Sequence, residues 1–350
     1  MADKLVDFGL DAWVLQQLAE SSRPRAQLGR VTEVQRSELR VMTDEGERRV
    51  SLAMELLRSD LIDRPTVGDW VVLNERRDTV EQVLDRRSLF KRAAAGRGDE
   101  IQPIAANVDT VFVVSSCNDE FKEARIERYL ALCHEAGVVP VLVLSKADLS
   151  DDPLAYEERA RKLHSQLAVE VVNATDPEDL AGLEAWIRPR STVALVGSSG
   201  VGKSTLLNAL AGKEMAATQG IREQDARGRH TTTHRALYRL PGGGLLIDVP
   251  GMRELRVTDV DEALGDVFED IDRLAGRCRF SDCAHASEPG CAIKAAIEDG
   301  ALDPRRLASY QKLQSENVEA TATIAQRRAR ARGFAKVVAE AKDWKQRSQE

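Results

Sequence analysis

Gly197-Ser-Ser-Gly-Val-Gly-Lys-Ser204 decides the fold, because this stretch is a complete G-x-x-x-x-G-K-S phosphate-binding loop. The apolar run 192–196 precedes the loop and the helix-forming run 205–210 follows it, as a strand and a helix flank such loops. Glycines let the backbone curl so that successive N–H groups point at phosphate oxygens, at the positive end of a helix dipole. The pattern predicts a parallel α/β domain that binds a nucleoside triphosphate.

The residues of this loop have distinct expected roles. Lys203 would neutralise the β- and γ-phosphates, and the Ser204 hydroxyl would bind Mg²⁺. The other predicted phosphate contacts come from the loop and from the residue that follows it: Gly197, Ser198, Ser199, Gly200, Val201, Gly202 and Thr205.

A second motif indicates which base is bound. Ser145-Lys146-Ala-Asp148 follows the apolar run 138–144, as the guanine-reading N-K-x-D motif of GTPases follows a strand. The Asp148 carboxylate would accept hydrogen bonds from the N1–H and the N2 amine of guanine, whereas adenine lacks that amine. Ser145 replaces the usual Asn, and the loss of one amide would weaken base affinity or relax its geometry.

Two further motifs complete a GTPase set. Asn173-Ala174 ends another apolar stretch, where GTPases place S-A-K, so the Ala174 N–H is expected to reach guanine O6. Leu245-Leu-Ile-Asp248-Val-Pro-Gly251 predicts a strand that ends in D-x-x-G. There Asp248 would hold magnesium through water, and the Gly251 N–H would contact the γ-phosphate.

The polar segment 213–234 separates the phosphate loop from that strand and contains Gly228-Arg-His230-Thr-Thr232-Thr. One of its three threonines would sense the γ-phosphate through magnesium and order the segment only in the triphosphate state. We favour Thr232 for this role. The alternative is a long polar loop with no switching role, although loops of this length are usually functional.

The order of the motifs is base motif, phosphate loop and switch segments, whereas an ordinary GTPase begins with the phosphate loop. A circular permutation builds the same sheet if strand neighbours are unchanged. On these four motifs, over roughly 28–315, the chain resembles the RsgA family, the circularly permuted GTPases that depend on the small ribosomal subunit. The resemblance implies a GTP-hydrolysing switch in late maturation of that subunit. It would bind the subunit and its rRNA with GTP and leave on hydrolysis.

Catalysis depends on what orients the attacking water. Many GTPases have a glutamine after D-x-x-G, but here the residue is Met252, whose thioether cannot position water. GTPases with a hydrophobic residue at this position are expected to hydrolyse GTP slowly until a partner or another side chain completes the site. His230 matches the histidine of the family's G-x-H-T-T-T motif, so we expect it to act with Lys203 and Thr232. A purely structural role for His230 is the alternative.

Three cysteines and a histidine are clustered as Cys278-x4-Cys283-x-His285-x5-Cys291. Their soft donors and spacing predict a closed tetrahedral zinc site, which the resemblance also implies at these four positions. The segment has too little apolar content to fold alone, so metal would supply its folding energy. The cysteines at 117 and 133 lie on apolar stretches and are expected to be small buried residues.

The region before the α/β domain contains five short β segments separated by turn signals, at 28–34, 38–43, 48–52, 69–73 and 80–84. They predict a small barrel of the OB type, which the resemblance also implies, although an SH3-like barrel fits the same pattern.

Two basic segments are candidate RNA contacts, although the net charge of −7 does not itself predict nucleic-acid binding. Residues 86–98 carry five cations and no acid, and would form either an RNA backbone track or a solvated linker. The chain is expected to be helical from about Pro304, with a dense cluster at 327–332. The resemblance favours RNA contact there over a solvated helical face.

With 350 residues and 43% hydrophobic content, the chain has room for three domains. We predict an N-terminal extension with an OB-like barrel (1–88), a circularly permuted α/β P-loop GTPase (89–272) and a zinc-binding, basic helical domain (273–350). The start lacks a signal core, no run approaches the ~20 apolar residues of a membrane span, and five uneven cysteines do not form a disulfide framework. We expect a cytoplasmic monomer without a membrane partner.

Two other functions fit parts of the pattern. One is a P-loop ATPase, against which Asp148 argues. The other is a non-hydrolysing RNA-binding scaffold in which the nucleotide is structural.

Overall fold

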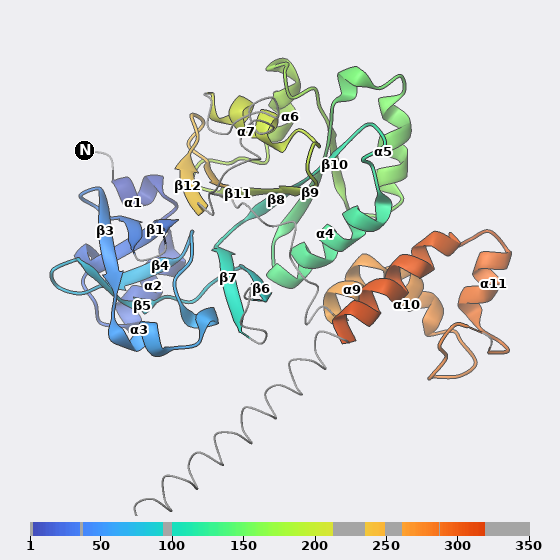
Figure 1. Cartoon of the computed structure of the whole chain (residues 1–350), viewed down its shortest axis with the longest axis horizontal. Helices are drawn as coiled ribbons and strands as arrows, with labels where there is room; N and C mark the ends of the chain where they lie inside the picture. Colours follow the sequence, from blue (N-terminus) through green and yellow to red (C-terminus); the bar gives the residue numbers. More distant parts are fainter. Residues whose placement is uncertain are drawn as a thin grey trace, which may run out of the picture.

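The computed structural model describes residues 3–35, 38–93, 100–212, 235–248, 261–286 and 288–318. Three parts follow one another along the chain (Figure 1): a β-barrel, an α/β domain and a helical C-terminal part. Among the described residues, no helix is long and apolar enough to cross a membrane.

The barrel has the OB arrangement. Its strands run in the order β1-β2-β3-β5-β4, and pairing of β4 with β1 closes the ring. The β3–β5 pair is parallel and the other pairs are antiparallel. This pairing is that of an OB barrel and differs from that of an SH3-like barrel. The five strands predicted from the sequence are confirmed, within one or two residues at each end, as β1 (Leu28–Val34), β2 (Leu39–Met42), β3 (Glu47–Leu52), β4 (Trp70–Leu73) and β5 (Thr79–Val83).

Strand β4 shows why the barrel is covered on one side. Val71 and Leu73 face the barrel interior, whereas Trp70 and Val72 face outward and are equally buried. The cover consists of α1 (Lys4–Asp7) and α2 (Ala12–Glu20), whose apolar side chains pack on that outer face. The sequence predicted only an extension before the barrel, and these helices were not expected. A third helix, α3 (Met54–Arg58), follows β3.

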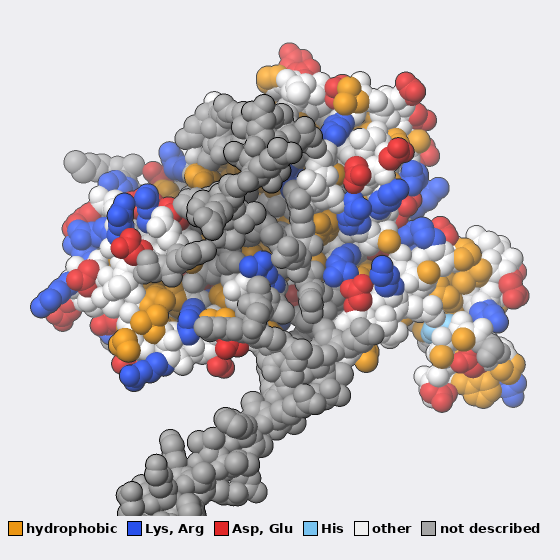
Figure 2. Space-filling model, in the orientation of Figure 1, with side chains coloured by type: hydrophobic (Ala, Val, Ile, Leu, Met, Phe, Trp, Pro, Cys, Tyr) orange, Lys and Arg blue, Asp and Glu red, His pale blue; other side chains and the backbone are white. Residues whose placement is uncertain are grey.

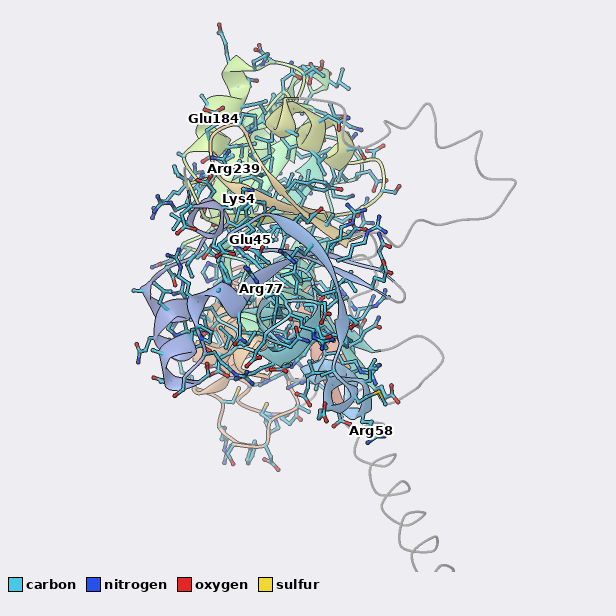
Figure 3. All side chains as sticks on the ribbon, turned by 90° about the vertical axis from the view of Figure 1, so that its left-hand side faces the viewer. Lys4, Glu45, Arg58, Arg77, Glu184 and Arg239 are labelled. Atoms are coloured by element: carbon cyan, nitrogen blue, oxygen red, sulfur yellow. The ribbon has the colours of Figure 1, made fainter. Side chains whose placement is uncertain are left out.

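Helix α1 also connects the barrel to the α/β domain. Lys4 Nζ donates to the Glu45 carbonyl at 2.6 Å, and Asp7 lies 3.7 Å from Arg239. Arg77 pairs with Glu45 at 2.5 Å. Figure 3 shows Arg239, Lys4, Glu45 and Arg77 in succession along one side of the molecule. The N-terminal helix therefore contacts both parts.

The α/β domain is built on a parallel sheet with strand order β10-β9-β8-β11-β13, and an antiparallel strand, β12, lies beside β13. The strands are β8 (Thr110–Ser116), β9 (Val139–Ser145), β10 (Ala168–Val171), β11 (Thr192–Gly197), β12 (Arg235–Arg239) and β13 (Leu245–Asp248). The helices are α4 (Glu123–Ala136), α5 (Pro153–Arg161), α6 (Ala181–Glu184) and α7 (Lys203–Ala211). Strand β9, which precedes the base motif, comes before the phosphate-loop strand β11 in the sequence. The expected permuted order is thus seen in the sheet.

Both faces of this sheet are covered, as the continuous apolar runs of its strands require. In β8, Val111 and Val113 belong to the cluster that includes α4, whereas Phe112 and Val114 belong to the cluster that includes α6 and α7. Successive side chains of a strand point to opposite faces, so one apolar strand serves both clusters.

The barrel and the α/β domain share one sheet. Strand β1 pairs antiparallel with β12, with Glu33 opposite Ala236 and Val34 opposite Arg235. At the same joint, the buried Arg30 donates to the carbonyls of Phe8, Gly68 and Asn107 and to the Thr192 hydroxyl. Burial lowers the pKa of Arg30 to about 10. One side chain therefore joins the N-terminal helices, the barrel and the parallel sheet.

The helices that follow β13 are α9 (Asp261–Val267), α10 (Glu269–Ala275), α11 (Ala292–Glu298) and helical residues 304–318. Residues 272 and 273, the predicted domain boundary, both lie within α10. The C-terminal part is attached to α4 by the fully buried Glu127, which accepts hydrogen bonds from Arg305 and Arg306. The expected helix from about residue 304 is present to 318, and the basic cluster 327–332 lies outside the described residues.

Candidate nucleotide site and metal centre

The predicted nucleotide motifs all follow parallel strands. The base motif comes after β9, Asn173-Ala174 after β10 and the phosphate loop after β11, while Asp248 ends β13. Because parallel strands place their carboxyl ends at one edge of a sheet, these motifs meet there, where ligands of open α/β folds bind.

The phosphate loop adopts the curled backbone expected of it. Gly197 has φ 146° and Gly202 has φ 88°. A Cβ atom on Gly197 would lie 2.3 Å from the Val114 carbonyl, so no side chain fits there. Helix α7 begins directly after Gly202, and no side chain caps it. No side chain therefore occupies the start of this helix, the end at which helices bind anions.

Lys203, Ser204 and Thr205 form the first turn of α7. The ammonium group of Lys203 folds back and donates to the Ser198 carbonyl, near the start of the loop. The lysine is thus held over the space that the loop encloses.

Ser145 joins the base motif to the phosphate loop. Its side chain is 1% exposed, and its Oγ lies 2.6 Å from the Val201 carbonyl and 2.9 Å from the Ser115 carbonyl. A hydroxyl has one proton, so the two carbonyls share a single donor. A Cβ on Gly202 would come within 3.3 Å of the same Oγ. The serine that departs from the usual Asn therefore fills a tight space between the two motifs.

The rest of the base motif is exposed. Lys146 has φ 59°, in the left-handed region, and precedes a short 3₁₀ turn, η3 (Ala147–Leu149). Asp148 lies in this turn, is exposed, and forms no ion pair with the part of the chain that the structure describes. Its carboxylate is available to donors of a ligand.

Asn173 and Ala174 differ in what they offer. Asn173 Oδ1 accepts from the Thr175 N–H at 3.0 Å and from the Thr175 hydroxyl at 2.7 Å, so it organises its own turn. The backbone N–H of Ala174 has no acceptor among the described residues. Of the two, Ala174 has the free donor that guanine O6 requires.

Several predicted site residues lie outside the described residues: the switch segment 213–234 with His230 and Thr232, and also Gly251 and Met252. Of Asp248, only the backbone is described. It pairs with Ala236 of β12.

The four predicted zinc ligands come together between α10 and α11. Their ligand atoms lie within 4.8 Å of one another. Cys278 Sγ lies 4.0 Å from Cys291 Sγ, and His285 Nδ1 lies 3.7 and 3.6 Å from these two sulfur atoms. A tetrahedral zinc with Zn–S near 2.3 Å and Zn–N near 2.0 Å sets its ligands about 3.5–3.8 Å apart. The cluster therefore fits zinc, which His285 would bind through Nδ1, the ring nitrogen that faces the two sulfur atoms.

The other two cysteines are structural. Cys117 and Cys133 are 2% and 1% exposed, which confirms the expectation of small buried residues. Burial raises the pKa of Cys117 to about 11, so its thiol stays protonated.

The cations that open the basic segment 86–98 are used within the protein. Arg86 forms two 2.8 Å hydrogen bonds with the fully buried Asp69. Arg87 lies 4.5 Å above the Trp13 ring, and Lys91 pairs with Glu135 of α4 at 2.7 Å. Their partners are distant in the sequence, so composition could not reveal them.

Lys91 lies in one arm of a hairpin, β6 (Leu89–Ala93) with β7 (Ile101–Ala106), and Arg86 and Arg87 directly precede it. This hairpin was not expected from the sequence. Arg86 and Arg87 therefore contact the barrel and its covering helices, and Lys91 contacts α4. Arg97 lies outside the described residues.

Comparisons with known proteins agree with this geometry. The family described as "RsgA GTPase" matches residues 83–258. The chain is 53% identical over 272 residues to "Small ribosomal subunit biogenesis GTPase RsgA 2" of Vibrio parahaemolyticus, covering 78% of this chain and 76% of that protein. It is 45% identical over 317 residues to "Small ribosomal subunit biogenesis GTPase RsgA" of Mesorhizobium japonicum, covering 89% and 90%.

Two solved structures share the fold. The crystal structure of YjeQ from Thermotoga maritima has a TM-score of 0.61 at 26% identity, covering 83% of this chain and 98% of that one. YloQ, described as a circularly permuted GTPase, has a TM-score of 0.56 at 26% identity, covering 86% and 95%. On the permuted sheet, the assembled motifs and these relatives, the chain belongs to the RsgA GTPase family.

Proposed function

We propose that this protein is a GTP-hydrolysing switch in late maturation of the small ribosomal subunit. It would bind the subunit and its rRNA in the GTP state and be released on hydrolysis. The relatives' names support the partner, because they describe GTPases of small-subunit biogenesis. The observation that supports the chemistry is the 2.6 Å contact of Ser145 with Val201, which joins a base motif to a phosphate loop.

In the proposed site, each described residue has a task that its position allows. Asp148 accepts from the N1–H and N2 amine of guanine, and the Ala174 N–H donates to O6. The N–H groups of the loop and Lys203 hold the β- and γ-phosphates. Ser204, and Asp248 through water, would hold Mg²⁺, which would supply positive charge at those phosphates.

In this proposal, the catalytic residues follow the phosphate loop in the sequence. Thr232 would sense the γ-phosphate, the Gly251 N–H would contact it, and His230 would orient the attacking water, because Met252 cannot. Turnover should be slow until the subunit places His230 within about one hydrogen bond, or one bridging water, of the nucleophile.

The domain order lets hydrolysis act on partner-binding parts. The C-terminal part, whose Cys₃His cluster would hold one Zn²⁺ and supply folding energy, follows β13 in the sequence and is attached to α4 through Glu127. We assign residues 1–88 to the extension and barrel, 89–272 to the GTPase and 273–350 to the zinc-binding and basic helical domain. The protein would act as a monomer in the cytoplasm, where subunits mature.

The test is GTP turnover with and without purified small ribosomal subunits. We expect strong stimulation that fades with added salt, because the proposed docking contacts are cations on phosphate. His230→Ala should lose the stimulation while retaining GTP binding, since it leaves Lys203 and Asp148 in place. Equal turnover with and without subunits would contradict the proposed switch, and displacement of GTP by equimolar ATP would favour an ATPase.

A further inference from the structure

One cation outside the predicted motifs contacts the phosphate loop: Arg125, in the first turn of α4. Its Nη1 lies 2.5 Å from Ser198 Oγ and 3.1 Å from Glu120 Oε2. Ser198 is the second residue of the loop, and its carbonyl accepts from Lys203. Two cations from different helices therefore meet on one residue of the loop.

The position of Ser198 indicates which end of a nucleotide Arg125 would face. The base motif meets the loop at Val201, through Ser145. At Ser198 the loop meets Lys203 instead, and lysines at this position of such loops reach the β- and γ-phosphates. Arg125 therefore lies at the phosphate end of the site.

Arg125 contributes little to folding. A cation in the first turn of a helix opposes the positive end of the helix dipole. Its side chain is 39% exposed and that of Glu120 is 47% exposed, so water screens the ion pair. By contrast, Arg306 of the C-terminal helix 304–318 is nearly buried where it pairs with Glu127 of α4. What Arg125 adds to the molecule is positive charge beside the loop.

Neighbouring cations differ from Arg125 in their partners. Figure 2 shows Lys and Arg side chains gathered over α4 and α5. Arg159 pairs with Glu123 at 2.7 Å, and Arg161 pairs with Glu157 at 2.6 Å. Arg125 instead divides its contacts between a carboxylate and a neutral hydroxyl of the loop.

We propose that Arg125 is a specificity-determining residue that favours GTP over GDP by facing the γ-phosphate end of the site with its guanidinium. The inference rests on the proposed function of this site. A γ-phosphate adds negative charge where Lys203 and Arg125 converge, whereas GDP leaves that charge unmatched. The guanidinium has five N–H donors, so it can keep Ser198 Oγ and still donate to a phosphate oxygen.

The experiment measures affinity for GDP and for a non-hydrolysable GTP analogue with Mg²⁺, on the full-length, zinc-loaded protein. Arg125→Gln should weaken binding of the analogue about tenfold, the scale of one hydrogen bond to a charged group, and GDP binding less than about twofold. Arg125→Lys keeps the charge and should recover much of the loss. Arg161→Gln, which removes an exposed arginine on α5, should leave the ratio of the two affinities unchanged.

The outcomes separate the two proposals. Equal weakening of GDP and analogue in Arg125→Gln, or no weakening, would show that Arg125 only supports the loop, and would overturn this inference alone. A wild-type protein that binds neither guanine nucleotide would overturn the proposed function. Melting temperatures of the variants check that each change leaves the fold intact.

Discussion

Ser145 and Asp148 have different roles in the predicted base motif. Ser145 is buried and bonds to the phosphate loop, whereas Asp148 is exposed and has no described ion-pair partner. The first holds two motifs together, and the second is available to a ligand. The serine at the usual Asn position therefore retains a link to the loop, while selectivity for guanine would depend on the carboxylate.

Asp148→Asn should exchange base preference. The amide presents a donor toward the edge where guanine itself has donors, while xanthine has an oxygen there. We expect GDP affinity to fall by at least about tenfold and binding of the xanthine diphosphate to appear, as measured by nucleotide titration. Asp151→Asn, at an exposed carboxylate three residues away, is the control and should leave both affinities unchanged. Unaltered GDP affinity in Asp148→Asn would remove this residue from the site.

At the scale of elements, local signals predicted what local interactions determine. The five barrel strands and the strand–loop–helix around Gly197 have turn residues and apolar periods of their own, and they formed where expected. The N-terminal helices and the β6–β7 hairpin were not identified, because packing against distant residues decides them. The contacts that join the three parts could not be predicted from the sequence for the same reason. Arg30 and Thr192 are 162 residues apart, and Glu127 and Arg305 are 178 apart.

In the segment between α10 and α11, no described residue of 276–290 is buried, so metal should control its folding. Purified protein should contain about one zinc, and Cys283→Ser should lose it and loosen residues 276–293. Metal analysis and hydrogen exchange measure the two effects. Nucleotide affinity should persist, because the nucleotide motifs lie at the edge of a separate sheet.

A matched change elsewhere gives the control for the zinc prediction. Cys117→Ala removes a thiol from the α/β core and should retain the metal. Freshly prepared wild-type protein without zinc would refute the assignment.

At the scale of the whole molecule, the barrel and the α/β domain behave as one body because they share a sheet and a buried arginine. Arg30 has hydrogen-bond partners at the end of α1 (Phe8), just before β4 (Gly68), between β7 and β8 (Asn107) and on β11 (Thr192). Its guanidinium also lies 5.4 Å from the Trp70 ring centroid. Relative motion of the two parts would break these contacts together.

Arg30→Met should destabilise the contact between the barrel and the α/β domain, so that the barrel unfolds first. Removing the guanidinium takes a donor from the carbonyls of Phe8 and Asn107, whereas the Gly68 carbonyl keeps the Asn107 amide. A buried carbonyl left without a donor costs about 1–3 kcal/mol. We expect a lower melting temperature and a first unfolding transition confined to the barrel, seen by calorimetry and by fluorescence of a variant in which Trp186 is replaced by Phe. Arg49→Met makes the same replacement at an exposed position of β3 and should leave a single transition at nearly the wild-type temperature. A single, unshifted transition in Arg30→Met would show that the β1–β12 pairing alone holds the joint.

The pairing of β1 with β12 also has a consequence for synthesis. Residues 28–30 of β1 pair with β4, and the pairing with β12 uses only Glu33 and Val34 at its far end. The barrel can therefore close while the chain is still being made. At about 5–20 residues per second, β12 emerges roughly 10–40 s after β1. During that interval Glu33 and Val34 already pair with β2, and only their other edge awaits β12. So short an open edge gives nascent chains little to mispair with.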